Sequence, residues 1–304
     1  MSDSGLRKFA TRASLLVATA LVALKFTAWI VTGSVALLTS AVDAVVDVGA
    51  SLVTYFGVRY ADRPPDREHR FGHGKGEAIA AFTQAMFLAG AALVLAFQSI
   101  ERLIFPQPLS SLRFGVWVVV ISLLAAAGLA AMQTWVVRST GSTAISADRA
   151  HYLTDVAVNV GVLLALVLTK LTDWQRADPA FAALISGYML WNAWRIAQEA
   201  LTQLLDRELP QQERQRIRAA ALACTGVRNI HDVRTRDAGD RIFVEFHLEV
   251  DGNLTVDRGH QIGDAAEMAV ANLLPGTVEV TAHLEPFGID DDRLDDRVRR
   301  RTRD

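Results

Sequence analysis

Two pairs of ionisable residues lie inside stretches of sequence that are otherwise apolar. Asp43 and Asp47 are four residues apart in one stretch, and His151 and Asp155 are four residues apart in another. On a helix this spacing places both members of a pair on the same face, one turn apart. Three carboxylates and one imidazole are a ligand set that suits a tetrahedral divalent ion such as zinc. The four residues therefore predict a metal site between two helices.

The apolar surroundings of these residues favour a bound cation. A charged side chain near the centre of a bilayer costs at least ~2.5 kcal/mol on insertion scales. Two carboxylates on one helix face repel each other unless a cation or a proton lies between them. The alternative is a pair of helices packed through hydrogen-bonded polar residues without an ion. Lys25, in an earlier apolar stretch, is interpreted as a structural or snorkelling residue rather than as a counter-ion.

Six apolar segments are long enough, or nearly so, to cross a bilayer core that needs roughly 20 helical residues. Lys and Arg concentrate in the N-terminal arm and in the loops after the second and fourth segments, which predicts that both termini are cytoplasmic. The alternatives are a cleavable signal peptide and a buried helical bundle of a soluble protein. The long series of nearly uncharged segments argues against both. The segments cover residues 13–32, 34–58, 78–100, 114–137, 145–169 and 179–198.

The last third of the chain has the composition of a soluble domain. Its pattern predicts an amphipathic helix, two strands, a second helix and a third strand. This α-β-β-α-β order indicates a small sheet with helices on one face, an α+β fold of the metallochaperone or ferredoxin-like kind. The predicted elements cover residues 210–223, 231–236, 240–250, 255–274 and 278–285.

Three regions are therefore expected along the chain. Residues 1–205 form a six-helix, all-α transmembrane transport domain, and residues 206–287 form a cytoplasmic metal-binding and dimerisation domain. Residues 288–304 are dense in charge with little to bury, and we expect them to be disordered.

The overall composition excludes several other classes of protein. The net charge of −2 gives no reason to expect a nucleic-acid partner. Cys224 is the only cysteine, so an internal disulfide and a thiolate metal cluster are both excluded within one chain.

A second candidate cluster lies in the loop after the second apolar segment. Asp66, His69 and His73 are spaced by three and four residues, and Gly72 and Gly74 allow a tight turn around an ion. The alternative is a solvated loop that happens to carry histidines.

A third candidate cluster lies in the soluble region. His283 and Glu285 are two residues apart in a predicted strand, so they point to the same face of the sheet. All seven histidines of the chain fall into one of the three clusters, which argues against scattered surface residues. The candidates in this cluster are His231, His247, His260, His283 and Glu285.

Together these motifs resemble the cation diffusion facilitator family, in its bacterial zinc and ferrous-iron efflux branch. The resemblance covers about residues 7–287. The segments that carry it are VDAVVDVGAS, HRFGHGKGEAIAA, ADRAHYLTDVAVN, LLDRELP and HDVRTR.

The resemblance implies a homodimer in the bacterial inner membrane that exchanges cytoplasmic metal for periplasmic protons by alternating access. The cargo and structural ion would be Zn2+, and Fe2+ or Cd2+ fit the same ligands. Lys75 and Asp206 match a pair that forms a salt-bridge interlock near the membrane surface. The remaining matches are the transport site (Asp43, Asp47, His151, Asp155), the loop site (Asp66, His69, His73) and the cytoplasmic site (His231, His247, His260, His283, Glu285).

The chain departs from the pattern of the family at two places. Arg149 and Ala150, just before His151, replace bulkier apolar residues that would form a gate. Leu284 lies between two cytoplasmic ligands, where a polar residue is often found.

Proton antiport also follows from the residues themselves. Metal ligands must lose their protons to bind, so protons compete with the ion for one site. A channel is the main alternative, but four convergent ligands bind an ion too tightly for rapid conduction. A membrane metal sensor is another alternative, in which the soluble region would be the active part. An intramembrane metalloenzyme needs an open coordination position and a general base. No HExxH motif is present and the candidate ligands are all used, so we predict no catalytic residues and no enzyme activity.

Overall fold

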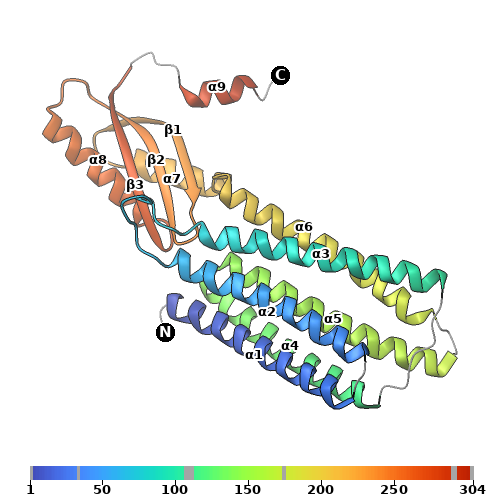
Figure 1. Cartoon of the computed structure of the whole chain (residues 1–304). Helices are drawn as coiled ribbons and strands as arrows, with labels where there is room; N and C mark the ends of the chain where they lie inside the picture. Colours follow the sequence, from blue (N-terminus) through green and yellow to red (C-terminus); the bar gives the residue numbers. More distant parts are fainter. Residues whose placement is uncertain (1–2, 33–34, 106–112, 173–175, 289–292, 302–304) are drawn as a thin grey trace. The chain divides into compact units, whose positions relative to one another are not determined.

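The structure is a computed structural model that describes residues 3–32, 35–105, 113–172, 176–288 and 293–301. The chain divides into two compact units, Met1–Leu201 and Thr202–Asp304. Figure 1 shows the helical first unit and the mixed α/β second unit, and each is described by itself.

The first unit is built from six long helices, which run beside one another in Figure 1. Their number and order agree with the sequence prediction, and each extends beyond its apolar segment. Length and apolarity alone mark three stretches of the described chain as able to cross a membrane: Asp3–Val31, Gly76–Ile104 and Val119–Thr140. The helices are α1 (Asp3–Thr32), α2 (Val35–Ala61), α3 (Gly76–Ile104), α4 (Arg113–Thr140), α5 (Thr143–Thr172) and α6 (Ala177–Leu204).

Small residues let these helices approach closely. A Cβ atom on Gly57 of α2 would lie 2.3 Å from the Cβ of Ala80 on α3, so only glycine fits at this contact. Many of the fully buried positions around it are alanines, including Ala10 and Ala144. Close backbone approach of this kind is typical of helix pairs in membranes, where van der Waals packing rather than water exclusion drives association.

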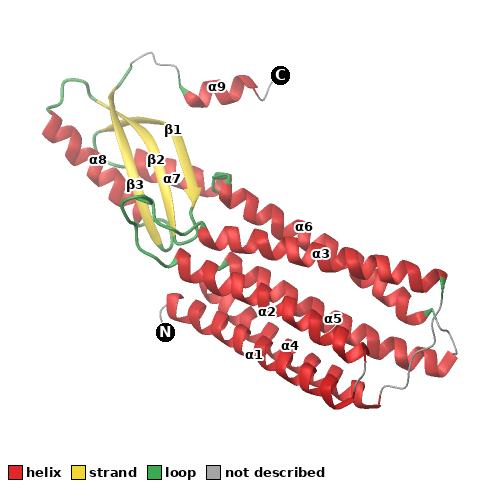
Figure 2. Cartoon of the chain, in the orientation of Figure 1, coloured by secondary structure: helices red, strands yellow, loops and turns green. Residues whose placement is uncertain are grey.

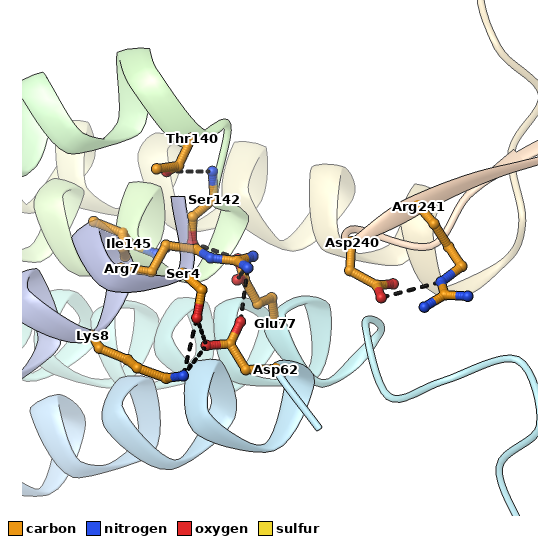
Figure 3. A network of polar contacts seen from close by, with 10 residues as sticks. All are labelled: Ser4, Arg7, Lys8, Asp62, Glu77, Thr140, Ser142, Ile145, Asp240 and Arg241. Atoms are coloured by element: carbon orange, nitrogen blue, oxygen red, sulfur yellow. Dashed lines mark hydrogen bonds and ion pairs between the residues drawn. The ribbon is translucent and has the colours of Figure 1, made fainter. Parts of the chain in front are cut away.

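A buried polar network joins four segments of the first unit (Figure 3). The Arg7 guanidinium of α1 donates to Asp62, just after α2, at 2.7 Å and to Glu77 of α3 at 2.8 Å. Ser4 also donates to Asp62 at 2.7 Å, and the Ser142 hydroxyl, just before α5, donates to the other oxygen of Glu77. The two carboxylates share one guanidinium, so this network fixes the end of the bundle at which α1 begins.

The second unit is a three-stranded sheet with two helices on one face (Figure 2). β2 lies in the middle, antiparallel to β1 and parallel to β3. α7 packs on β1, α8 packs on β3, and the two helices contact each other. The α-β-β-α-β prediction is thereby confirmed. The elements are α7 (Gln211–Leu222), β1 (Val227–Asp237), β2 (Arg241–Val250), α8 (Val256–Ala271), β3 (Thr277–Pro286) and α9 (Leu294–Arg301).

Alternation along the strands separates a core face from a polar face. Phe246 and Leu248 of β2 are buried in the core with Ile262 of α8. Because successive side chains of a strand point to opposite faces, His247 and Glu249 lie on the face away from the two helices. One face of the sheet therefore packs in the apolar core, and the polar side chains of the other face are available to bind a ligand.

The C-terminal segment differs from the prediction of disorder. Within residues 288–304, Leu294–Arg301 form helix α9. The Asp232 carboxylate accepts the first backbone N–H groups of this helix, from Leu294 at 2.7 Å and Asp295 at 2.8 Å. The cap comes from a distant strand, so the composition of the tail alone does not reveal it.

We predict that Arg7→Ala lowers the free energy of unfolding by about 3–5 kcal/mol, because it leaves two buried carboxylates without their cation. Lys8→Ala is the matched control. The Lys8 ammonium also contacts Asp62, at 3.0 Å, but its side chain is 44% exposed. We expect the Lys8 change to cost less than about 1 kcal/mol. Unfolding in detergent micelles measures the free energy of unfolding of both variants. Equal decreases in the two variants would contradict the role of Arg7 as the main partner of the two carboxylates.

Candidate metal sites

The first candidate site lies between α2 and α5. His151 Nε2 lies 3.1 Å from an oxygen of Asp47 and 3.7 Å from an oxygen of Asp155. One ligand atom from each residue falls within 4.8 Å of the others. Asp43, the fourth predicted member, belongs to α2, and its side chain lies outside the described residues. Two carboxylates and one imidazole that converge in this way can bind a divalent transition-metal ion.

Hydrogen bonds between helices hold α5 in place beside this site. The Tyr152 hydroxyl lies 3.1 Å from the Ser51 hydroxyl of α2. Gln133 of α4 donates to Asp148 of α5 at 2.6 Å and to Ser14 of α1 at 2.8 Å. All these residues are buried. These hydrogen bonds hold the neighbouring helices against α5, so they position His151 and Asp155.

The second candidate site lies in the loop between α2 and α3. An oxygen of Asp66 accepts the backbone N–H groups of Glu68 at 2.9 Å and His69 at 2.7 Å. His73 Nε2 lies 3.2 Å from the other oxygen, and the rings of His69 and His73 lie 4.6 Å apart. Gly72 makes the turn between them with a φ of 85°, which favours glycine. The structure brings together all three residues predicted for this site.

The backbone of this loop also keeps Asp66 ionised. The N–H of His69 in particular, helped by that of Glu68, holds the pKa of the Asp66 carboxyl below its ordinary value. The Asp66 carboxylate can therefore bind a metal ion without first losing a proton.

The third candidate site lies on the polar face of the sheet. The register places His231, His247 and His283 side by side on the three strands. His247 Nδ1 lies 2.6 Å from Glu285, and His231 Nε2 lies 3.4 Å from the other oxygen of that carboxylate. His231, His247 and Glu285 form the third group with ligand atoms within 4.8 Å of one another. His283 lies at the rim, with Nε2 3.5 Å from Glu285.

Some predicted residues are not joined to these sites. His260 lies on α8, where it is exposed and 3.5 Å from Asp264. The helices cover the opposite face of the sheet, so His260 does not reach the cluster on the polar face of its own domain. Lys75 belongs to the first compact unit and Asp206 to the second, and their salt bridge stays a prediction.

Leu284 departs from the family pattern without removing a ligand position. It alternates with His283 and Glu285, so it points to the helix side of the sheet, where it packs against the core. A Cβ atom at Gly259 or Gly263 of α8 would lie 3.7 or 3.6 Å from its methyl groups. Leu284 therefore packs the sheet against α8.

Glu249 lies beside the third site, although the sequence patterns did not predict it. Its carboxylate lies 3.0 Å from His231 Nδ1, and the residue is 2% exposed. A signal was available, because the tripeptide His-Leu-Glu occurs twice, at 247–249 and at 283–285. The two copies are paired residue for residue in parallel strands.

Comparison with known proteins gives matches over nearly the whole chain. The family description "Cation efflux transmembrane domain" matches residues 11–205, and "Cation efflux protein, cytoplasmic domain" matches residues 209–287. The cation-efflux pump FieF of Klebsiella pneumoniae is 43% identical over 277 residues, which cover 91% of this chain and 92% of that protein. FieF of Salmonella choleraesuis is 42% identical over 280 residues, covering 92% and 93%. A solved structure of CzrB in its Zn form is 39% identical and covers 29% of this chain and 99% of that one, with a TM-score of 0.26.

We predict that His151→Asp shifts the metal preference of the protein toward manganese, because an all-oxygen site is harder in character. Competition binding of zinc and manganese to the purified protein measures the shift. Gln212→Asp, which adds a carboxylate at an exposed position of α7 outside the three sites, is the control and should leave the preference unchanged. An unaltered preference in His151→Asp would show that these ligands do not select the ion.

Proposed function

We propose, from the premise that this chain belongs to the cation efflux family, also called the cation diffusion facilitators, that it exports divalent transition-metal ions in exchange for protons. Family membership rests on the two domain matches and on relatives 43% identical over most of the chain. The protein is accordingly a divalent metal cation efflux transporter. The proton coupling, the identity of the ion and the residues that carry it are the parts that we propose.

The convergence of Asp47, His151 and Asp155 supports the transport site most directly. These residues come from two helices far apart in the sequence, and their ligand atoms lie within 4.8 Å of one another. Asp43, one turn before Asp47 on α2, is proposed as the fourth ligand. A set of carboxylate and imidazole ligands suits Zn2+, and also Fe2+ and Cd2+.

Proton coupling follows from competition for the same ligand atoms. Carboxylate and imidazole bind a metal ion only without their protons, so a proton that enters the site displaces the cargo. Alternate opening of the site to the two sides of the membrane then couples inward proton flow to outward metal flow. Gly49 and Gly161 are proposed to let the helices tilt.

The other two clusters are proposed as accessory metal sites. Asp66, His69 and His73 would bind an ion in the loop that leads into α3. His231, His247, His283 and Glu285 would bind structural zinc on the sheet and help to hold a homodimer. His260 is proposed only as a peripheral member of this site.

The remaining proposals concern topology. We propose that all six helices cross the bacterial inner membrane with both termini in the cytoplasm, and that Lys75 and Asp206 form an interlocking salt bridge. Residues 1–205 would then be the transport domain and residues 206–287 the cytoplasmic domain.

Zinc uptake into reconstituted vesicles tests this proposal. We predict that a proton gradient with the vesicle interior more acidic than the outside accelerates uptake by the intact protein. We also predict that Asp155→Ala abolishes uptake while the protein still folds. Glu101→Ala, which removes an exposed carboxylate near the end of α3, is the control and should transport normally. Uptake that ignores the proton gradient would refute antiport. Normal uptake by Asp155→Ala would refute the site.

A further inference from the structure

Glu249 connects the proposed cytoplasmic metal site to the C-terminal segment. One oxygen of its buried carboxylate lies 3.0 Å from His231 Nδ1 and accepts from Asn229 at 2.8 Å and from Arg293 at 3.0 Å. The other ring nitrogen of His231 faces Glu285. His231 therefore lies between Glu249 on one side and the metal cluster on the other.

This arrangement fixes which nitrogen of His231 is presented to a metal ion. An ionised carboxylate can only accept a hydrogen bond, so Nδ1 of His231 carries the proton that it donates to Glu249. The lone pair is then on Nε2, which points toward Glu285. Carboxylates placed behind metal-bound histidines in this way orient the ring and increase its basicity.

The position of Arg293 is fixed by the docking of α9. Arg293 directly precedes this helix, and Asp232, the neighbour of His231 in β1, accepts the backbone N–H groups of Leu294 and Asp295. Asp295 in turn accepts the backbone N–H of Asp232 at 3.3 Å. Asp232 has a φ of 50°, an uncommon value for a non-glycine residue, at an irregularity in β1. The fold thus holds α9 beside the cluster through a reciprocal pair.

The charges of Glu249 and Arg293 bear on the binding of a metal ion at the neighbouring cluster. Glu249 is 2% exposed, and a buried carboxylate requires a compensating positive charge. Arg293 supplies that charge in this structure, from a side chain that is 28% exposed. A divalent ion at His231, His247 and Glu285 would place two further positive charges beside the same group. Arg293 would then repel the ion at short range.

We propose that Glu249 is a positioning residue of the cytoplasmic metal site and that Arg293 opposes metal binding there, so that a bound ion and the docked C-terminal helix disfavour each other. The inference rests on the proposed cytoplasmic site. Coupling between two binding events is reciprocal, so the ion weakens the docking of α9 to the extent that α9 weakens the binding of the ion.

Two substitutions in the ion pair test this proposal by the sign of their effects. The zinc affinity of the cytoplasmic site is measured on the full-length protein in detergent. It is taken from the difference in zinc binding between the protein with an intact site and the same protein carrying His247→Ala. We expect Glu249→Gln to weaken this affinity about tenfold or more, and Arg293→Gln to strengthen it about tenfold. Arg300→Gln makes the same charge change at an exposed position of α9 and should leave the affinity unchanged.

A purely structural ion pair gives a different result. In that case either substitution breaks the same contact, and both change the affinity in the same direction, which would overturn the proposal. Equal affinities in Arg293→Gln and the intact protein would also overturn it. If His247→Ala binds as much zinc as the intact protein, the cytoplasmic site itself is wrong, and this outcome is distinct from failure of the coupling.

Hydrogen exchange at residues 294–301 provides a readout that is independent of affinity. Addition of zinc to the intact protein should speed exchange of these backbone amides, because the ion displaces Arg293 and α9 loses its dock. His247→Ala should show no response to zinc in this segment. Unchanged or slower exchange in the intact protein on zinc addition would contradict the opposition between ion and helix.

Discussion

The electrostatics of α2 and α5 constrain the rest of the membrane domain. Asp47 and Asp155 meet at His151 inside helices that are mostly apolar. Two carboxylates so close together cannot both remain charged in a poorly polarisable environment unless positive charge lies between them. In the proposed mechanism that charge is either the metal ion or protons. Exchange of the two is then a consequence of the site itself, because an empty, fully ionised site is the unfavourable state.

This requirement explains why so much of the helical unit is cross-linked by buried polar groups. Gln133 joins α4 to Asp148 and Ser14, and Gln84 of α3 donates to the Ala50 carbonyl oxygen and the Thr54 hydroxyl of α2. Neighbouring helices in a bilayer gain little from the hydrophobic effect, so close packing and such hydrogen bonds must fix their positions. The Arg7 network adds charged cross-links at one end of the bundle. A site that needs ligand atoms within a few ångströms depends on these contacts between helices.

Sequence patterns predicted those features that depend on local spacing. The interval of four residues placed His151 and Asp155 on one helix face, and the Asp-x-x-His-x-x-x-His spacing brought the loop residues together. The patterns were weaker where distant segments meet. His260 lies on a predicted amphipathic helix, but only the packing of α8 shows that it faces away from the polar side of the sheet. Helix α9 was missed because its cap, Asp232, and the partner of Arg293, Glu249, come from distant strands.

In the cytoplasmic domain, the topology of the sheet brings the two His-Leu-Glu tripeptides side by side. A parallel pair of strands needs a crossover, and α8 provides it between β2 and β3. The register that results sets His247 beside His283 and Glu249 beside Glu285. The leucines between them, Leu248 and Leu284, both face the core and lock this register, since a slip of one residue would bury the histidines. The two tripeptides are nevertheless unequal in the fold, because Glu285 faces the histidine rings while Glu249 lies behind His231. In the proposed site, identical sequences thus supply a metal ligand in one strand and the support of a ligand in the other, and the position of His231 on β1 creates this distinction.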